Sequence, residues 1–420
     1  MKPEDIHWLD EEDSEQPAEE PEQAAEAEPE TPPAPTKKPR KNRSFSWIFV
    51  MIALLIGVFV LFVTGGFKKL FGGNRTQTLR AMSDPILYTT DSVTRVRPFG
   101  DLALHMSANG LRAYNTNGTL AWDLPFTMSY PSLVTSDRCA IIADLGGTQI
   151  LLIDETGLLN TITTEASILY CTVNHNGYTA AILDSGDSHT LVVFDQFGRT
   201  LVRRITYADQ DGVPMAIAIN DDASCMATAY MIYTEAELRS AVTLFNLTDS
   251  GSDSIDRIAG NYTYTNTLIS DLYYMGDELI AIGDNRIVGI RSTGNTAEDW
   301  NQEISYEITA LGFGSDFIAL LQGEGLVGVA GASEHDMLVI GVDGKRRLEL
   351  NMEDSRGLWV QGDVIVYQDG FDYIALDRAG NQIWSYNAEN AMQLYPIGEK
   401  AALGNTGGSM QFYMTVSGGE

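Results

Sequence analysis

The chain has 420 residues and a formal net charge of −30, from 57 acidic and 27 basic side chains. About −26 of this charge follows residue 75, and a domain that acidic repels phosphate backbones, which excludes nucleic acid as a favoured partner. Three cysteines, Cys139, Cys171 and Cys225, cannot all pair and lack C-x-x-C spacing. They are therefore expected to be buried, inert thiols, with neither a disulfide framework nor a metal site.

Residues 1–43 form an acidic tail rich in Glu, Pro, Ala and Gln. Such a segment buries too little apolar surface to offset its ordering entropy, so we expect it to be disordered. Ile6, Trp8 and Leu9 stand out as apolar residues among acids. They form a candidate docking motif for a cytoplasmic partner, and the alternative is that they are simply the end of the tail.

Residues 44–66 are expected to be a single transmembrane helix. The run from Phe45 to Thr64 contains no charged residue, and roughly 20 apolar residues span the bilayer core. Five basic residues between Lys37 and Arg43 precede it and only Lys68 and Lys69 follow closely, which places the N-terminus in the cytoplasm and the C-terminal domain outside. The alternative, a cleaved signal peptide, is disfavoured because the run is long and lacks an A-x-A-like site.

After a flexible linker expected over residues 67–84, the chain from residue 85 to 420 is predicted to be all-β. Short apolar or alternating runs are separated by Gly, Asp and Asn turns. One unit recurs, in which a strand ends at Asp or Asn and a glycine follows three positions later. Clear copies are Asn115–Gly118, Asp195–Gly198 and Asp377–Gly380. Asp or Asn bonds the backbone two residues on, and glycine supplies the positive φ that turns the chain.

Eight copies, two of them degenerate, recur at a mean interval of about 43 residues, close to the ~40–50 residues of a four-stranded propeller blade. The last copy has too little chain left for an outer strand. Strands over residues 85–90 and 92–97 are expected to pair with it and close the ring. The sequence therefore favours an eight-bladed β-propeller, with seven blades as the alternative and a pair of β-sandwiches as the competing fold.

The repeats, as in Asp377-x-x-Gly380-x-x-Ile-Trp384, are similar to those of quinoprotein-like and WD40-like propellers. The whole layout resembles a family of membrane-anchored propeller proteins of Gram-positive bacteria that is known only as a domain of unknown function. The resemblance implies an extracytoplasmic propeller and carries over no catalytic residue.

No motif indicates a cofactor, a metal or a catalytic centre. The five histidines lack metal-ligand spacing, and His175 falls in a turn where exposure to solvent is expected. Asp209-Gln-Asp211-Gly212 begins like a calcium loop, but Asn220 stands where an EF-hand needs Glu, so a turn at a blade edge is the favoured interpretation.

The expected function is non-enzymatic: a propeller displayed outside the bacterial cytoplasmic membrane that binds an envelope protein or glycan. Propellers suit this role because strands fix the loops while loop sequences vary. The alternative is a polysaccharide hydrolase or lyase that uses carboxylates at the propeller channel, and several acids with perturbed pKa in one concave pocket would favour it. A calcium-dependent sensor is a third hypothesis.

Overall fold

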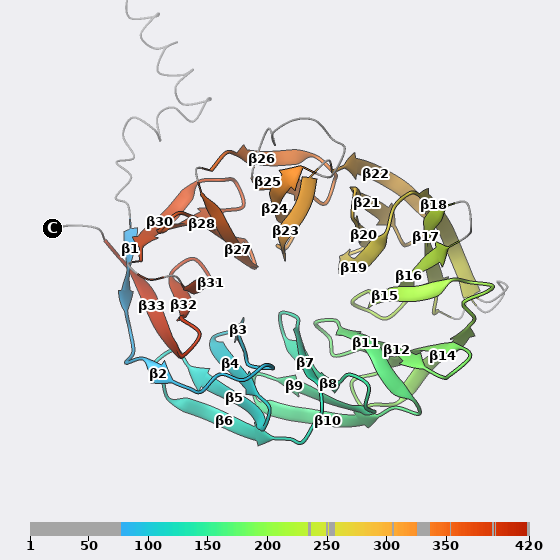
Figure 1. Ribbon diagram of the computed structural model, residues 1–420, viewed down its shortest axis with the longest axis horizontal. Helices are drawn as coiled ribbons and strands as arrows, with labels where there is room; N and C mark the ends of the chain where they lie inside the picture. The colour runs from blue at the N-terminus through green and yellow to red at the C-terminus, as the bar shows by residue number, and fades with distance from the viewer. Residues whose placement is uncertain are drawn as a thin grey trace, which may run out of the picture. The chain divides into compact units, whose positions relative to one another are not determined.

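The computed structural model describes residues 77–233, 237–248, 251, 257–304, 306–325, 337–352, 354–388, 390 and 392–417. They belong to one compact unit, Asn74–Glu420. The described residues form 33 strands and no α-helix. Figure 1 shows these strands grouped into sheets that surround a central opening. The all-β class and a propeller-like architecture are confirmed, and a pair of β-sandwiches is excluded.

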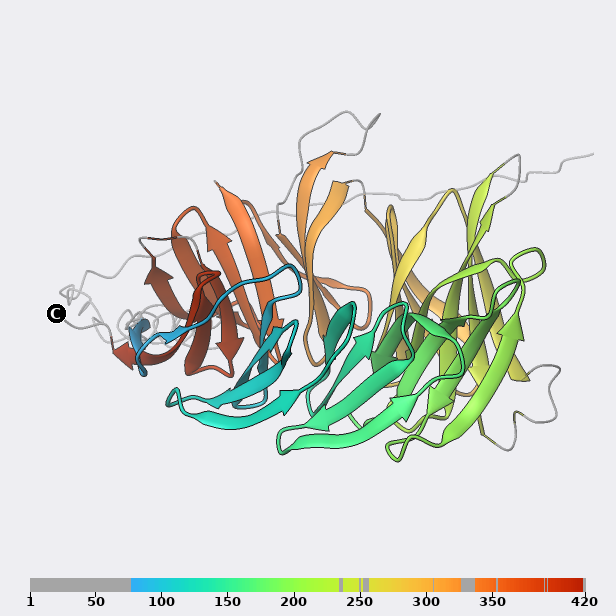
Figure 2. The ribbon, with the colours of Figure 1, turned by 60° about the horizontal axis from the view of Figure 1, so that its bottom comes forward.

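Six sheets have four strands each, which run in chain order from the central opening to the outer rim (Figures 1 and 2). The first three are β3 (Arg95–Phe99), β4 (Leu102–Ser107), β5 (Gly110–Asn115) and β6 (Leu120–Pro125); β7 (Pro131–Thr135), β8 (Cys139–Asp144), β9 (Gln149–Asp154) and β10 (Gly157–Thr163); β11 (Ser167–Val173), β12 (Thr179–Asp184), β13 (His189–Phe194) and β14 (Thr200–Thr206). The next three are β15 (Val213–Ile219), β16 (Cys225–Tyr233), β17 (Leu238–Asn246) and β18 (Ile258–Thr265); β19 (Ile269–Met275), β20 (Glu278–Gly283), β21 (Arg286–Arg291) and β22 (Ala297–Glu303); β23 (Tyr306–Phe313), β24 (Phe317–Gly325), β25 (Met337–Gly341) and β26 (Arg346–Leu350).

The seventh sheet has nine strands and contains both ends of the described chain. Its strands are β27 (Ser355–Gln361), β28 (Val364–Asp369), β29 (Asp372–Asp377), β30 (Gln382–Asn387), β31 (Gln393–Ile397), β32 (Ala401–Asn405), β33 (Ser409–Ser417), β1 (Gln77–Ala81) and β2 (Ile86–Leu87). Strand β1 pairs antiparallel with β33 over five residue pairs and touches β30 through one parallel pair, Gln77 with Trp384.

The structure therefore has seven hydrogen-bonded sheets. The sequence favoured eight blades and left seven as the alternative. The difference arises where the ring closes. Strand β1 completes a four-stranded group with β31–β33, and its single bridge to β30 merges that group with β27–β30.

Eight buried apolar clusters lie between neighbouring four-stranded groups and form the core. Side chains alternate across a strand, so the second strand of a group feeds two clusters. In β20, Leu279 and Ala281 enter one cluster while Ile280 and Ile282 enter the next. Burial on both faces explains why these strands read as continuous apolar runs. The cluster of Val96, Leu403 and Phe412 joins the first sheet to the last.

The recurrent turn has the geometry that the sequence predicts. At Asp195 the carboxylate accepts a bond from the Phe197 amide at 2.9 Å, and the Gly198 amide donates to the Asp195 carbonyl at 2.9 Å. Gly198 has a φ of 76° and Gly380, in the equivalent turn, has 78°. A glycine is favoured at both positions because other residues are strained there.

Ring closure differs in part from the expectation. Ile86–Leu87 pairs with the C-terminal strand β33, as predicted. The segment around Arg95 instead forms β3, the innermost strand of the first sheet. The closing outer strand is Gln77–Ala81, inside the segment expected to be linker, so the β-structure begins before residue 85. The five residues of β1 bury only Leu79 strongly, a weak pattern from which to predict a strand.

The predicted transmembrane helix over residues 44–66 and the tail with Ile6, Trp8 and Leu9 lie outside the described residues. Among the residues that are described, the structure contains no helix with the length and apolar character needed to cross a membrane.

Candidate functional site

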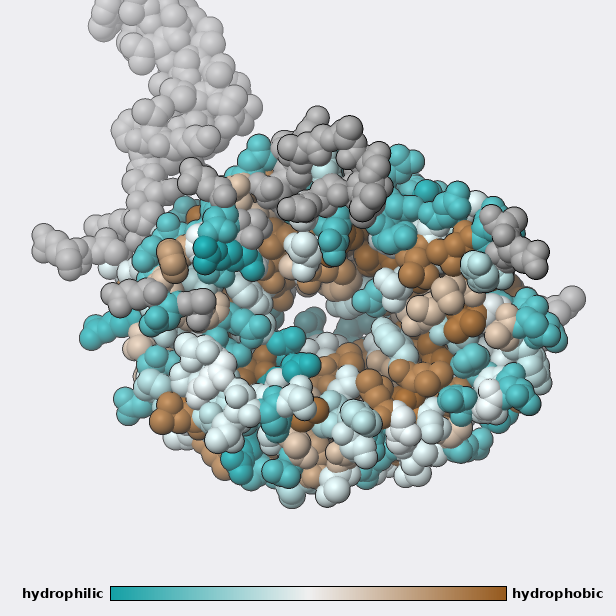
Figure 3. Space-filling model, in the orientation of Figure 1, coloured by the Kyte–Doolittle hydropathy of each residue, from teal (hydrophilic) through white to brown (hydrophobic). Residues whose placement is uncertain are grey.

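One end of the central opening holds a cavity of about 290 Å³, here called the channel pocket. Its wall comes from the innermost strands β7, β11, β15, β19 and β23 and from the turns that follow them. All sheets repeat one strand order, so the C-terminal ends of these strands gather at the same end of the ring. Figure 3 shows apolar residues facing the opening and hydrophilic residues over much of the outer rim. Its lining includes Asp137, His175, Asp221, Asp271, Tyr273 and Phe313.

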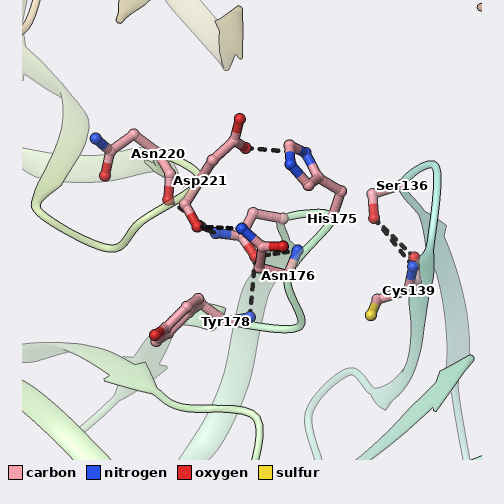
Figure 4. A network of polar contacts seen from close by, with 8 residues as sticks. Ser136, Cys139, His175, Asn176, Tyr178, Asn220 and Asp221 are labelled. Carbon is pink, nitrogen blue, oxygen red and sulfur yellow. Dashed lines mark hydrogen bonds and ion pairs between the residues drawn. The ribbon is translucent and has the colours of Figure 1, made fainter. Parts of the chain in front are cut away.

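Two turns from neighbouring sheets dock onto each other at this pocket (Figure 4). His175 Nδ1 lies 3.0 Å from Asp221 Oδ1, and both side chains are partly exposed. Beneath this pair, Asn174 Nδ2 donates to the Asn220 carbonyl at 2.8 Å, and Asn176 Nδ2 donates to the Asp221 carbonyl at 2.8 Å. Three side chains of one turn are thus held against the next turn, and the position of the Asp221 carboxylate is fixed.

The Asp221 carboxyl has a raised pKa. Burial is the largest cause, the nearby carboxylates of Asp222 and Asp137 add to it, and His175 acts in the opposite direction. Several negative groups therefore compete in a small space. Such a concentration of negative charge favours the entry of a cation, which would relieve the repulsion.

An aromatic pair forms another part of the wall. The rings of Tyr273 and Phe313 stack with centroids 4.0 Å apart and an interplanar angle of 10°. Packing of the phenol against the wall raises the pKa of Tyr273 to about 12, with Asp137 and Asp221 contributing, so the hydroxyl stays neutral. Even so, 39% of Tyr273 remains exposed, which leaves part of the residue available to a ligand.

Asp271, in the middle of β19, is tied into the wall. Its Oδ1 accepts bonds from the Leu272 amide at 3.0 Å and from the Tyr170 hydroxyl at 3.3 Å. Burial raises the pKa of Asp271, and these two hydrogen bonds oppose the shift. Burial, with Asp271 adding to it, likewise raises the pKa of Tyr170. Asp271 thus combines a structural role with a position on the pocket wall.

The channel pocket joins carboxylates to exposed aromatic surface. Both groups attract cations, the first by charge and the second by the negative face of the ring. No group of three or more His, Cys, Asp or Glu side chains is arranged to hold a metal ion in the described part of the chain.

The residues singled out in the sequence occupy different places. His175 lies in the expected turn, but its pairing with Asp221 was not anticipated. Asp211, from the calcium-like stretch, lies in the turn between β14 and β15, where its carboxylate accepts bonds from the Thr206 hydroxyl and the Tyr207 amide. This stretch thus forms a turn at a blade edge, as the favoured interpretation predicts. All three cysteines are free and buried, as predicted, and burial raises the pKa of Cys171 to about 12.

Sequence reasoning missed Asp137, Asp221, Tyr273 and Phe313. One signal was present: Asp137, His175 and Asp221 each lie in the turn after the innermost strand of three successive sheets. Aligning the repeats on that turn would have placed them together.

A family model described as "Family of unknown function (DUF5711)" matches residues 80–403, from β1 into β32. No curated protein is similar in sequence. Similar solved structures include BamB from Moraxella catarrhalis, with 15% identity, a TM-score of 0.48 and coverage of 79% of this chain and 99% of that one.

Two further structures are similar to a comparable degree. Apo AztD from Citrobacter koseri has 12% identity and a TM-score of 0.48, covering 76% of this chain and 92% of that one. The Pan2 WD40 domain from Neurospora crassa has 7% identity and a TM-score of 0.43, covering 83% and 97%.

Proposed function

The chain belongs to the family of unknown function DUF5711, and we propose that its propeller is a non-enzymatic binding module for a protein of the bacterial cell envelope. The channel pocket is the proposed binding site. Its ligand is a positively charged side chain, lysine or arginine, presented by a segment of the partner.

The observation that carries this proposal is the combination of Asp221 with the Tyr273–Phe313 pair in one cavity. A desolvated cation above an aromatic ring gains about 0.5–2 kcal/mol, and the carboxylate adds direct charge attraction. The acidic surface of the whole domain raises the local concentration of a basic partner before contact.

Isothermal titration of the full chain with a tetra-lysine peptide tests the proposal. We expect saturable binding that weakens at high salt and no binding of tetra-glutamate. Asp221→Asn should lower the affinity about threefold to tenfold, roughly 0.7–1.4 kcal/mol. The matched control is Asp187→Asn, which removes the same charge from an exposed turn between β12 and β13.

A second pair of variants separates the ring from the charge. Tyr273→Phe keeps an aromatic face and should bind tetra-lysine within about twofold of wild type, whereas Tyr273→Leu should bind about threefold more weakly. If Asp221→Asn and Asp187→Asn lost affinity for tetra-lysine equally and Tyr273→Leu had no effect, the attraction would be diffuse. That result would refute a channel site.

One observation favours a second candidate, a polysaccharide hydrolase or lyase. Asp221 and Asp271 both have raised pKa values and line the same concave pocket, and a raised pKa is typical of carboxyls that act as general acids. The ion pair of Asp221 and the two bonds to Asp271 Oδ1 favour structural roles instead. New reducing ends released from bacterial wall polysaccharide by the wild type but not by Asp271→Asn would establish the enzyme.

We also interpret the nine-stranded sheet as two blades, so that the propeller has eight. The eight apolar clusters, one for each junction between four-stranded groups, support this count. The two groups share a single bridge, Gln77 with Trp384. Gln77→Pro weakens that bridge and the end pair of Gln77 with Ser417, and the ring should stay folded because four other pairs hold β1 on β33. Collapse of the ring would indicate one indivisible sheet.

Anchoring completes the proposal. The uncharged run over residues 44–66 and the basic residues before it support a single span with the tail in the cytoplasm. Protease added to wall-stripped cells should then digest the propeller and spare an epitope on the tail. Digestion of the tail with protection of the propeller would reverse the orientation.

A further inference from the structure

A second cavity, of about 610 Å³, lies at the N-terminal ends of innermost strands and is here called the arginine pocket. Its lining includes Arg95, Arg97, Arg356, Trp359 and Gln393. Arg95 and Arg97 are the first and third residues of β3 and so project from the same side of that strand. Arg356 is the second residue of β27, and Gln393 is the first of β31. The channel pocket lies at the opposite ends of the innermost strands.

The pocket is a basic site in an acidic domain. Arg356 pairs with Asp354. Arg95 donates to the Thr94 carbonyl at 2.8 Å, and Arg97 donates to the Val96 carbonyl at 3.0 Å. Within the described residues, no ion pair with a carboxylate engages Arg95 or Arg97. Two guanidinium groups therefore retain N–H donors that a ligand can use.

One acid, Asp91, also lines this pocket, and its carboxylate already accepts hydrogen bonds from neighbouring groups. Asp91 accepts bonds from the amides of Val93 and Ala108 at 3.0 and 2.9 Å, and from the Thr94 hydroxyl at 2.7 Å. Because Arg356 is paired with Asp354, the balance is set by Arg95 and Arg97 against Asp91, which leaves the lining positive.

A hydrogen-bond chain holds Arg97 in place. Its Nη1 donates to the Tyr395 hydroxyl at 2.6 Å, and the guanidinium lies 5.4 Å from the centre of that ring. The Tyr395 hydroxyl donates to Gln393 Oε1 at 3.0 Å, and Asn405 Nδ2 donates to the same oxygen at 3.0 Å. Asn405 Oδ1 in turn accepts from Tyr88. The chain links β3, β31 and β32, and such support fixes a binding group before the ligand arrives.

The rest of the wall suits a polyhydroxylated ligand. Gln393 uses its oxygen in the chain, which leaves its amide N–H groups as donors. Trp359, half-buried in the wall, offers an indole beside these polar groups. The volume lies in the range of small-molecule sites, about 300–1,000 Å³.

We propose that the arginine pocket binds an acidic sugar, a monosaccharide unit that bears a carboxylate or a phosphate group. Arg95 and Arg97 bind the oxyanion, since the guanidinium fork matches both groups in geometry. Gln393 and its neighbours bind the hydroxyls, and Trp359 packs against the apolar face of the sugar ring. This ligand has the opposite charge from the one proposed for the channel pocket, so the two assignments are independent.

Titration of the full chain with glucuronate, glucose 6-phosphate, glucose and inorganic phosphate tests the proposal by calorimetry. At least one acidic sugar should bind tenfold or more tightly than glucose, and the preferred one identifies the group as carboxylate or phosphate. Inorganic phosphate should bind more weakly than glucose 6-phosphate, and equal binding would overturn the assignment to a sugar.

Variants locate the site. Arg95→Gln, at an exposed side chain, should weaken binding of the acidic sugar about tenfold while the melting temperature stays unchanged. Arg97→Lys keeps the charge but loses the fork and should also weaken it about tenfold. Arg80→Gln, an exposed arginine on β1, is the charge-matched control. Binding that is unchanged in Arg95→Gln, or reduced equally in Arg80→Gln, would overturn the proposal.

Discussion

Trp300 Nε1 donates a 2.7 Å hydrogen bond to the carbonyl of Val342, which lies in a turn of the next sheet around the ring. The same contact recurs earlier, where Trp122 Nε1 donates to the Glu155 carbonyl at 2.9 Å. In both cases the tryptophan lies on the outermost strand of its sheet. An outer-strand indole that bonds to the following sheet therefore links neighbouring blades near the rim.

This contact predicts a large difference between two similar glycine variants. Gly344 and Gly294 have φ values of 74° and 67°, so alanine is strained at both, by about 1–2 kcal/mol. A Cβ at Gly344 would lie 2.4 Å from the Trp300 ring, whereas nothing lies within 4 Å at Gly294. Gly344→Ala should lose about 1–3 kcal/mol more stability than Gly294→Ala because of overpacking. Urea unfolding measures the difference, and equal losses would refute the close packing of Trp300.

Ring closure predicts that residues before 85 are needed for stability. Leu79 of β1 is 6% exposed and belongs to the cluster that includes Trp384 and Leu394. Leu79→Ala should cost about 2–4 kcal/mol, while Arg80→Ala, on the same strand and exposed, should cost less than about 0.5 kcal/mol. Thermal unfolding of the two variants gives the comparison. A Leu79→Ala protein as stable as wild type would show that β1 does not close the ring.

Glu278 predicts a pH dependence of folding. Its Oε1 is buried with no hydrogen-bond partner among the described residues. Burial, the largest cause, and the nearby Asp299 raise the pKa of Glu278 to about 7, against the opposing effect of Arg291. The folded state thus binds more protons than the unfolded state, whose carboxyl has a pKa near 4.5. The stability from this group is complete below pH 4.5 and is lost as the pH rises through 7.

Glu278→Gln removes this dependence. Relative to wild type, the variant should gain about 1–2 kcal/mol between pH 4.5 and pH 8. A fully buried carboxyl would give ~1.4 kcal/mol for each pKa unit of the shift. The expected gain is smaller than that total because the Glu278 carboxyl is partly solvated. Denaturant unfolding at several pH values measures the gain, with exposed Glu303→Gln as the control. A pH-independent difference between Glu278→Gln and wild type would contradict the buried, protonated carboxyl.

Much of the fold could be predicted because its signals are local. The turn from Asp195 to Gly198 needs one side-chain acceptor and one positive φ, and both are visible in the sequence. Strand β1 could not be recognised in this way. It is defined by pairing with β33, more than 300 residues away in sequence, and only its central Leu79 is strongly buried.

The candidate sites were harder to predict than the fold. Asp221 and Tyr273 line the same cavity only because the innermost strands converge. Nothing in the local sequence of either residue distinguishes it from other turn or strand residues. The same holds for Arg97, whose partner Tyr395 lies on the last innermost strand. Aligning the repeats assigns Asp221 to one end of the ring, but it does not show which residues of different sheets share a cavity, because that depends on the closed architecture.

The proposed role of the channel pocket is to receive a cationic side chain of a binding partner. Nuclear magnetic resonance of the full chain, with labelled tyrosine and phenylalanine rings, can follow this binding during a titration with tetra-lysine. We expect saturable shifts that are concentrated at Tyr273 and Phe313 and are strongly reduced in Asp221→Asn. Small shifts spread evenly over rings across the acidic surface, and unchanged in Asp221→Asn, would contradict it.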